Sequence, residues 1–279
     1  MKAGPLPLSV WATAQRTSQV QRRGRYLPAS MAHPAKMLPA VAAAAVEAYT
    51  APGDLVVDPM CGIGTTLVEA AHLGRDAFGV EYEPRWAQLA RANLAHARAR
   101  GASGSARVAT GDGRRLASLL GAERRGTAAL VLTSPPYGPS LHGRVEKRPG
   151  GGIGKRDDRY SDDRTNLGRV GLRPLLTALE EILVACAAVL RADGLVVLTT
   201  RPWRRQGELV DFPSEVVRVA EGAGLVLFER NVALLAGLSG DRLVSRASFF
   251  QLDAARKARA RGIPRLVIAH EDVLVFRRP

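Results

Sequence analysis

Short apolar runs alternate with helix-like segments through most of this sequence, and this order constrains the fold more than any other feature. The runs suited to buried strands are residues 54–57, 77–80, 107–109, 128–132, 195–200 and 225–229. Segments with helical spacing lie before and between them, at residues 38–48, 65–73, 83–98, 116–120, 172–190 and 213–221. Strands that alternate with helices in this way form a parallel sheet covered on both faces. The sequence therefore predicts an α/β fold.

The ends of the chain differ from this central pattern. Residues 1–30 contain five Lys and Arg residues and no Asp or Glu, which predicts a basic N-terminal arm ahead of one domain over residues 31–279. Near the other end, the apolar runs 265–268 and 273–276 predict two closing strands, which we expect to form a hairpin at the sheet edge.

A long connection, residues 138–172, separates the fourth expected strand from the next helix. Loops of this length in a compact domain are usually functional or disordered. The glycines at 150–152 and the mixed charges cannot bury enough apolar surface to order by themselves. We therefore expect a flexible substrate loop here, and a passive insert is an equal alternative.

The charge of the chain favours a polyanionic partner. Lys and Arg number 40 and Asp and Glu number 26, so the net charge is +14. Basic surfaces bind nucleic acid because neutralised phosphates release counterions. Nucleic acid is the leading expectation and an anionic membrane surface the second, although a compositional bias toward arginine would give the same excess.

The two cysteines, Cys61 and Cys186, are too few for a disulfide framework or a zinc site. No apolar stretch reaches the roughly 18 residues of a membrane span, and the N-terminus lacks the apolar core of a signal peptide. These features predict a soluble protein of the cytoplasm that needs no metal.

Asp58-Pro59-Met60-Cys61-Gly62-Ile63-Gly64-Thr65-Thr66 lies where the first central strand ends and a helix begins. In a doubly wound sheet, ligands bind outside the carboxyl ends of the strands, and glycines let the backbone approach them closely. Glu81 ends the next strand at the spacing used to bind a ribose diol, and Asp112 follows the third strand, where it could accept from an adenine amino group. The predicted cofactor-binding residues are Asp58, Pro59, Cys61, Gly62, Gly64, Thr65, Glu81, Tyr82 and Asp112.

The glycine loop lacks the third glycine of the dinucleotide fingerprint, which argues against a pyrophosphate at the helix N-terminus. An adenosine without phosphates fits better, and S-adenosylmethionine has that character. The alternative is that these residues form ordinary tight turns of an α/β protein.

A second motif, Thr133-Ser134-Pro135-Pro136-Tyr137, follows the fourth expected strand. With residues 58–66 it resembles the S-adenosylmethionine-dependent amino-methyltransferases of DNA, whose signature is Asp, Asn or Ser followed by Pro-Pro and an aromatic residue. The form that begins with Ser is typical of cytosine-N4 enzymes. Residues 33–37 also resemble a cofactor-side segment of this family, and the similarity spans residues 33–202. The related tRNA guanine-N2 methyltransferases share the style of the glycine loop.

The resemblance implies a Rossmann-like class I methyltransferase fold, with a mostly parallel seven-stranded sheet and S-adenosylmethionine as cofactor. The lone pair of an exocyclic amino group is delocalised into its ring until acceptors draw its hydrogens out of plane. Ser134 Oγ and the Pro135 carbonyl are the candidate acceptors, and Pro135 and Pro136 fix two φ angles. Tyr137 would stack on a base extruded from the duplex.

Three hypotheses follow. The first is a DNA amino-methyltransferase that modifies cytosine N4, or less readily adenine N6. The second is an RNA guanine-N2 methyltransferase acting on tRNA or rRNA, favoured by the lack of an obvious recognition domain. The third is a nucleic-acid-binding protein without catalysis. Recognition would rest on the arm, the 138–172 loop or the tail from Arg230 to Pro279, where Lys257, Arg259, Arg261 and Arg265 crowd together.

Overall fold

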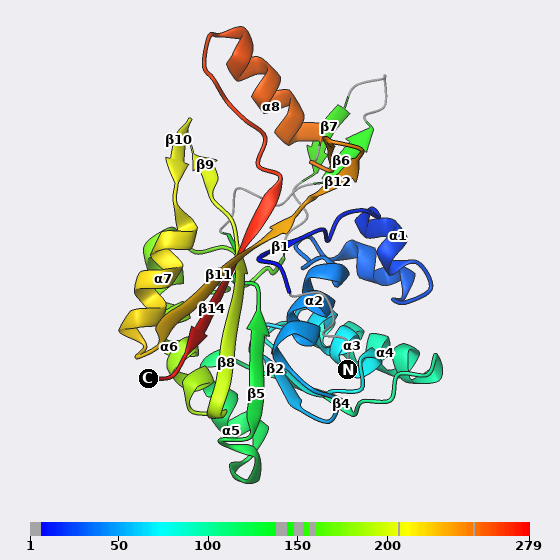
Figure 1. Cartoon of the computed structure of the whole chain (residues 1–279), viewed down its shortest axis with the longest axis vertical. Helices are drawn as coiled ribbons and strands as arrows, with labels where there is room; N and C mark the ends of the chain where they lie inside the picture. Colours follow the sequence, from blue (N-terminus) through cyan, green and yellow to red (C-terminus); the bar gives the residue numbers. More distant parts are fainter. Residues whose placement is uncertain (1–6, 138–143, 148–152, 157–159, 206, 248) are drawn as a thin grey trace.

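An eight-stranded sheet forms the centre of the computed structural model, which describes residues 7–137, 144–147, 153–156, 160–205, 207–247 and 249–279. The strand order is β1-β11-β14-β8-β5-β2-β3-β4 (Figure 1). Their bounds are β1 Val10–Trp11, β2 Leu55–Asp58, β3 Asp76–Glu81, β4 Ala106–Thr110, β5 Ala128–Thr133, β8 Leu190–Thr200, β11 Val226–Leu234 and β14 His270–Arg277.

Most neighbouring strands of this sheet are parallel. The pairs β2–β3, β3–β4, β2–β5, β5–β8 and β1–β11 are parallel, and β14 is antiparallel to both β8 and β11. The predicted α/β class is confirmed. The sheet has one strand more than the seven expected, because the two-residue β1 adds to its edge beside β11.

Helices cover both faces of the sheet (Figure 1). One layer contains α2 (Pro39–Tyr49), α3 (Thr65–His72) and α4 (Pro84–Ala99), and the other contains α5 (Leu116–Leu120), α6 (Leu172–Ala187) and α7 (Phe212–Gly222). In β5, Leu130 and Leu132 pack in the first layer and Val131 in the second. Because both faces are buried, the central strands are continuous apolar runs rather than alternating ones.

The predicted closing hairpin is wrong. Residues 263–269 form no strand, and β14 alone carries the last apolar run, between β8 and β11. Pro264 has no N–H for a strand ladder. The place that a second closing strand would take is filled by β11, which continues to Leu234 instead of ending near residue 229.

The described residues of the N-terminal segment pack on the domain. They include α1 (Ser18–Arg22) and the 3-10 turn η1 (Pro28–Ala32). Arg25 Nε donates to both carboxylate oxygens of Glu69 at 2.9 Å, and the Tyr26 hydroxyl donates to Glu69 Oε1 at 2.6 Å. Glu69 is buried in α3. Residues 7–30 are therefore held against the fold, and the domain boundary at residue 30 stays a prediction.

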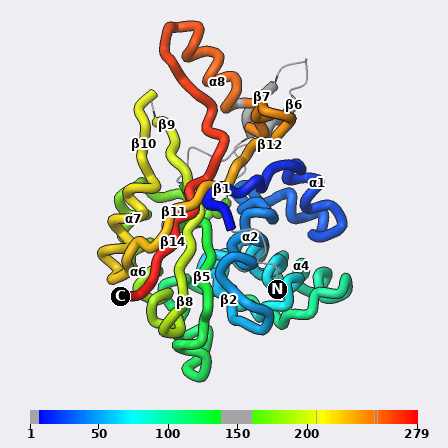
Figure 2. Tube along the Cα trace, viewed as in Figure 1, coloured from blue at the N-terminus to red at the C-terminus, as the bar shows by residue number. Residues whose placement is uncertain are grey.

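Several elements that the sequence did not reveal project beyond the carboxyl ends of the parallel strands (Figure 2). They are the hairpins β6–β7 (Arg144–Lys147 and Ile153–Arg156), β9–β10 (Trp203–Arg205 and Glu208–Val210) and β12–β13 (Ala236–Ser239 and Arg242–Ser245), and α8 (Phe249–Ala260). Two further 3-10 turns, η2 (Gly113–Arg115) and η3 (Ala122–Arg124), flank α5. Within the described ranges, no helix has the length and apolar character needed to cross a bilayer.

Candidate active site

A pocket of about 760 Å³ opens at the carboxyl ends of β2, β3, β4 and β5. It brings together twelve of the thirteen predicted site residues. They are Asp58, Pro59, Cys61, Gly62, Thr65, Glu81, Tyr82, Asp112, Ser134, Pro135, Pro136 and Tyr137. Gly64 does not line it. Gly64 precedes α3 with a left-handed φ of 82°, and a Cβ there would lie 3.3 Å from Ala90 Cβ, so its structural role is in the turn.

The glycine loop has little room for side chains. Gly62 has a φ of 54°, and a Cβ on it would lie 3.0 Å from His33 Nε2. Cys61 packs toward β3, where a Cβ on Gly79 would lie 2.8 Å from its sulfur. Burial raises the pKa of the Cys61 thiol well above its usual range. Gly113 was not predicted, yet a Cβ there would lie 2.6 Å from the Pro59 carbonyl oxygen, so the loop also needs this glycine.

Asp58, the last residue of β2, is a buried acid at the base of the pocket. Its carboxylate accepts hydrogen bonds from Met60 N at 3.0 Å and from Thr66 Oγ1 at 2.7 Å. Burial raises its pKa to about 6, although these donors act in the opposite direction. The two bonds fix the carboxylate against the turn that leads into α3.

Glu81, the last residue of β3, is 1% exposed. Its carboxylate accepts from Gly62 N at 2.8 Å and Glu83 N at 2.9 Å, and the Tyr160 hydroxyl lies 3.1 Å from both oxygens. Burial raises its pKa to about 7. The acid predicted to bind a ribose diol therefore already holds one hydroxyl, from the chain itself.

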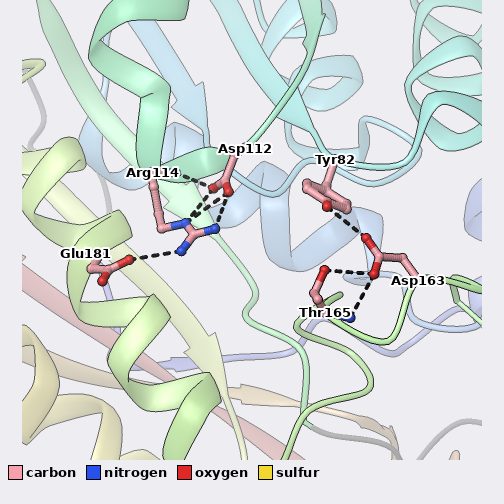
Figure 3. Close-up of polar contacts among 6 residues, drawn as sticks. All are labelled: Tyr82, Asp112, Arg114, Asp163, Thr165 and Glu181. Carbon is pink, nitrogen blue, oxygen red and sulfur yellow. Dashed lines mark hydrogen bonds and ion pairs between the residues drawn. The ribbon is translucent and has the colours of Figure 1, made fainter.

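Residues 160–169 lie over the end of β3. The Tyr82 hydroxyl donates to Asp163 Oδ2 at 2.8 Å (Figure 3), and Asn166 Nδ2 donates to Glu83 Oε1 at 2.9 Å. The Tyr160 ring contacts His33 edge-on, with centroids 4.9 Å apart. This part of the expected flexible loop thus bonds to three consecutive residues, 81–83.

Residues 138–143, 148–152 and 157–159 of that loop lie outside the described residues. Sequence reasoning missed Tyr160 and Asn166, which line the pocket, and Asp163, which bonds to Tyr82 of the pocket. A signal was present, because Asp and Asn often accept from the backbone two residues on. Asp163 accepts from Thr165 N at 2.8 Å and Asn166 from Gly168 N at 2.9 Å, so each starts a local turn.

Asp112, at the end of the β4 connection, is engaged by Arg114. Arg114 donates to it from its backbone N–H at 2.9 Å and from Nε at 2.9 and 3.1 Å, and it also reaches Glu181 at 3.2 Å (Figure 3). Hydrogen bonding to Arg114 lowers the pKa of Asp112. Its partly exposed carboxylate lines the pocket while paired with Arg114.

The Ser-Pro-Pro-Tyr segment leaves β5 directly after Thr133. Tyr137 packs edge-on against Trp203 and Phe212, with centroids 6.0 and 5.9 Å apart. The Arg201 guanidinium carbon lies 5.4 Å from the centre of its ring. Trp203 is buried in this aromatic cluster.

Arg201 and Glu271 are among the charged residues of the pocket that were not predicted. Arg201 follows β8, and Glu271 is the second residue of β14. Because β14 runs antiparallel, its first residues lie at the same edge as the last residues of its parallel neighbours. No local motif marks such a position, so the sequence could not place Glu271.

Comparison with known proteins adds to this geometry. Residues 1–92 match a family model, N6_N4_Mtase, described as DNA methylase. The crystal structure of TrmN from Thermus thermophilus matches 93% of this chain with a TM-score of 0.52 and 19% identity. This chain has the Rossmann-like methyltransferase fold. It spans about half, 53%, of the TrmN chain.

Magnesium protoporphyrin IX methyltransferase from Synechocystis PCC 6803, solved with bound SAM, is less similar, with a TM-score of 0.48 and 13% identity over 95% of this chain and 85% of that one. The DNA methylase match and the fold agree with S-adenosylmethionine, the cofactor that the sequence predicts.

The methyltransferase fold explains how two distant motifs come to share one pocket. The glycine loop follows β2 and the Ser-Pro-Pro-Tyr segment follows β5, about 70 residues later in the sequence. β2 and β5 are parallel neighbours, with Val57 opposite Val131. Their carboxyl ends therefore meet at one edge of the sheet, which places the glycine loop beside the Ser-Pro-Pro-Tyr segment.

Proposed function

We propose that this protein transfers a methyl group from S-adenosylmethionine to an exocyclic amino group of a base in DNA, with cytosine N4 ahead of adenine N6. The observation that carries the proposal is the shared pocket, which residues 58–62 line from β2 and residues 134–137 from β5. The DNA methylase match of residues 1–92 supports the assignment.

The cofactor half of the pocket suits an adenosine with a methionine portion. Gly62 lets the loop backbone lie close to His33, where a Cβ would come within 3.0 Å of Nε2. Asp58 lies beside the glycine loop, where we assign it to the methionine portion, and Glu81 and Asp112 are assigned to the ribose hydroxyls and the adenine amino group. Tyr82, 44% exposed, is assigned to the adenine side of this half.

Bound S-adenosylmethionine supplies an electrophilic methyl group on a sulfonium. Ser134 Oγ and the Pro135 carbonyl accept the two amino hydrogens and draw them out of the plane of the base, so that the nitrogen lone pair becomes available. The new bond joins the methyl carbon to this nitrogen, the bond from carbon to sulfur breaks, and one amino proton is released. The rigid Pro135–Pro136 backbone keeps the acceptors aligned, and alignment of reactants accounts for much of such a rate.

A basic surface near the pocket supports a nucleic-acid partner. α8 and the segment after it contain no acid from residue 254 to 270. Their cations are Arg256, Lys257, Arg259, Arg261 and Arg265. α8 projects beyond the sheet on the side where the pocket opens (Figure 1). We assign this surface to phosphate contacts, which position a substrate without reading its sequence.

The test of the function is to identify the methylated nucleoside. Purified protein is incubated with isotope-labelled S-adenosylmethionine and separate pools of unmethylated DNA and unmodified RNA, and each pool is digested and analysed by mass spectrometry. We expect labelled N4-methylcytosine from DNA. Cofactor binding without label in either pool, and with intact nucleic-acid affinity, would instead favour the non-catalytic alternative.

An RNA guanine-N2 methyltransferase is the second candidate. The glycine loop resembles that family, and the strands and helices between the two motifs leave no room for an inserted recognition domain among the described residues. Labelled N2-methylguanosine found only in RNA would select this candidate and keep the cofactor half of the assignment.

Tyr160→Phe is expected to tighten cofactor binding about fivefold. In the structure the Tyr160 hydroxyl bonds to Glu81, so a ribose diol has to displace it, and one hydrogen bond contributes about 1 kcal/mol net. Calorimetric titration with S-adenosylmethionine measures the change. Tyr49→Phe is the control, since its hydroxyl bonds to Glu229 outside the pocket. Weaker binding by Tyr160→Phe would show that this hydroxyl holds the cofactor rather than competing with it.

Cofactor affinity is expected to rise about tenfold between pH 6 and pH 8. Hydroxyl donors need the ionised form of Glu81, whose pKa of about 7 makes it mostly protonated at the lower pH. The same shift affects folding, because the pKa of Glu81 is raised above its usual 4.5 in the folded state. The contribution of Glu81 to the free energy of unfolding is therefore largest below pH 4.5 and is lost as the pH rises through 7. Dissociation constants measured across this range for wild type and Glu81→Gln check the prediction, and an equal slope in both would contradict it.

A further inference from the structure

Two buried polar atoms at the substrate end of the pocket have no hydrogen-bond partner among the described residues. They are the Tyr137 hydroxyl and Glu271 Oε2. Buried polar groups without a partner are rare in folded proteins and are often satisfied by a ligand. Both residues line the pocket together with Ser134 and Pro135. These atoms indicate that the substrate, or a residue rearranged by it, completes this end of the site.

Arg201 and Glu271 lie at adjacent positions on neighbouring strands. Asp272 of β14 pairs with Thr200 of β8, so Glu271 and Arg201 are the next positions toward the pocket. Burial raises the pKa of Glu271, and the charge of the nearby Arg201 acts in the opposite direction. The Arg201 guanidinium nevertheless lies over the Tyr137 ring, with its central carbon 5.4 Å from the ring centre. It therefore covers the aromatic surface on which a base would stack.

We propose that Arg201 reads the edge of the target base by donating to the ring acceptor beside the amino group, and that Glu271 positions the guanidinium for this contact. The proposal rests on the proposed base methylation and adds a specificity-determining residue to it. A base that stacks on Tyr137 takes the place of the guanidinium. Arg201 then moves toward the base edge and the free oxygen of Glu271, which gives that buried oxygen a partner.

The edge of cytosine fits this arrangement. Its N4 amino group offers two hydrogens, which Ser134 Oγ and the Pro135 carbonyl accept. N3 and O2, next along the same edge, are acceptors, and a guanidinium offers several donors in a planar fork. Adenine has one such acceptor, N1, beside its amino group. Guanine has an N1–H donor on one side of its amino group and the N3 acceptor, next to the sugar, on the other. With the base oriented as described for cytosine, the N1–H would face the guanidinium. Arg201, positioned by Glu271, therefore favours cytosine over adenine and disfavours guanine.

The test removes the contact between Arg201 and N3 of the base, once by changing the substrate and once by changing the protein. The substrates are matched DNA oligonucleotides with cytosine or 3-deazacytosine at the target, in which a C–H replaces the N3 acceptor. For the wild type we expect kcat/KM to fall about 30-fold on 3-deazacytosine, the loss of a charge-assisted hydrogen bond. For Arg201→Gln, kcat/KM on cytosine should be about 30-fold below that of wild type. On 3-deazacytosine it should fall by no more than about threefold further, because the contact between residue 201 and N3 is already absent in this variant.

Three further measurements distinguish a role of Arg201 in base recognition from a purely structural role. Glu271→Gln should lower kcat/KM on cytosine about fivefold and reduce the penalty for 3-deazacytosine, with Glu271→Asp restoring part of it. Arg205→Gln is the control, because Arg205 is exposed on β9 and does not line the pocket. Cofactor affinity should stay within twofold of wild type in every variant, since Arg201 and Glu271 lie outside the cofactor half.

Equal losses on 3-deazacytosine for wild type and Arg201→Gln would overturn the reading role while the methyltransferase function stands. A wild type that methylates guanine N2 would also overturn it, because in the orientation assigned to cytosine the Watson–Crick edge of guanine places N1–H against the guanidinium, which cannot accept a hydrogen bond. A wild type that fails to bind S-adenosylmethionine would instead remove the proposed function itself, and this inference with it.

Discussion

Ser134→Ala is expected to lower kcat about 100-fold while the dissociation constant for S-adenosylmethionine stays within twofold. Its hydroxyl is assigned to an amino hydrogen in the transition state, and removing one such aligned polar group typically costs a factor of 100 to 1,000. The cofactor half, around Asp58 and Glu81, is built by other strands, so cofactor binding should not change. Single-turnover methylation and calorimetric titration measure the two quantities separately.

Ser103→Ala is the matched control for this variant, because Ser103 is exposed in the connection before β4 and lies outside the pocket. Ser134→Asp is a useful third variant. The family that the motif resembles also uses Asp at this position, and a carboxylate keeps an acceptor there, so it should retain more activity than alanine. Full activity in Ser134→Ala would show that Ser134 does not accept an amino hydrogen and that the Pro-Pro turn only ends the strand.

Glu81→Gln is expected to weaken S-adenosylmethionine binding about 100-fold. The two carboxylate oxygens of Glu81 accept from Gly62 N and Glu83 N, and both hydroxyls of a ribose would add to them. A glutamine can offer only one oxygen, so one N–H of the chain faces an amide NH₂ and one ribose hydroxyl is left without its acceptor. The N–H is lost with or without cofactor, so the weaker binding comes from the ribose. A hydrogen bond to an ionised acceptor contributes about 1.5 to 3 kcal/mol, and losing one such bond together with the charge on the other corresponds to this factor.

Thermal unfolding of Glu81→Gln at pH 8 separates binding from folding. Burial raises the pKa of Glu81 to about 7, so at pH 8 the ionised side chain is unfavourable to the fold, and a neutral glutamine removes that charge. We therefore expect a melting temperature close to that of wild type. Glu47→Gln, on the exposed side of α2, is the control. Wild-type affinity in Glu81→Gln would mean that the ribose binds elsewhere.

The sequence was most informative where one strand and one turn suffice to define a feature. The glycine loop and the Ser-Pro-Pro-Tyr segment each follow a buried run directly, so their place at the carboxyl edge of the sheet follows from the order of the elements. The runs that became β2, β3 and β5 were located to within one residue at both ends.

Features made by distant segments could not be read in the same way. Tyr160 reaches Glu81 from a loop 79 residues later. Glu271 reaches the pocket because β14 inserts antiparallel between β8 and β11, and that choice depends on tertiary pairing rather than on the local pattern. The arginines of the N-terminal segment looked like a solvated arm, yet Arg22 is buried and donates to the Met37 carbonyl. The charge of an arginine in the sequence does not show whether its side chain is solvated or packs against another segment.

The short strand β1 protects only the last part of its neighbour. Val10 and Trp11 pair with Val232 and Ala233, and among the described residues no strand pairs with that side of β11 from Val226 to Asn231. Val226 and Phe228 are exposed there, a combination that invites another chain to add a strand. Two features oppose this. The pairing of β11 with β14, on its other side, shifts register between Leu227 and Glu229, so β11 itself is irregular there, and the Arg277 guanidinium carbon lies 5.1 Å from the centre of the Phe228 ring. An irregular, cation-covered border of this kind disfavours intermolecular strand pairing, so the same stretch that closes the sheet also guards the molecule against self-association.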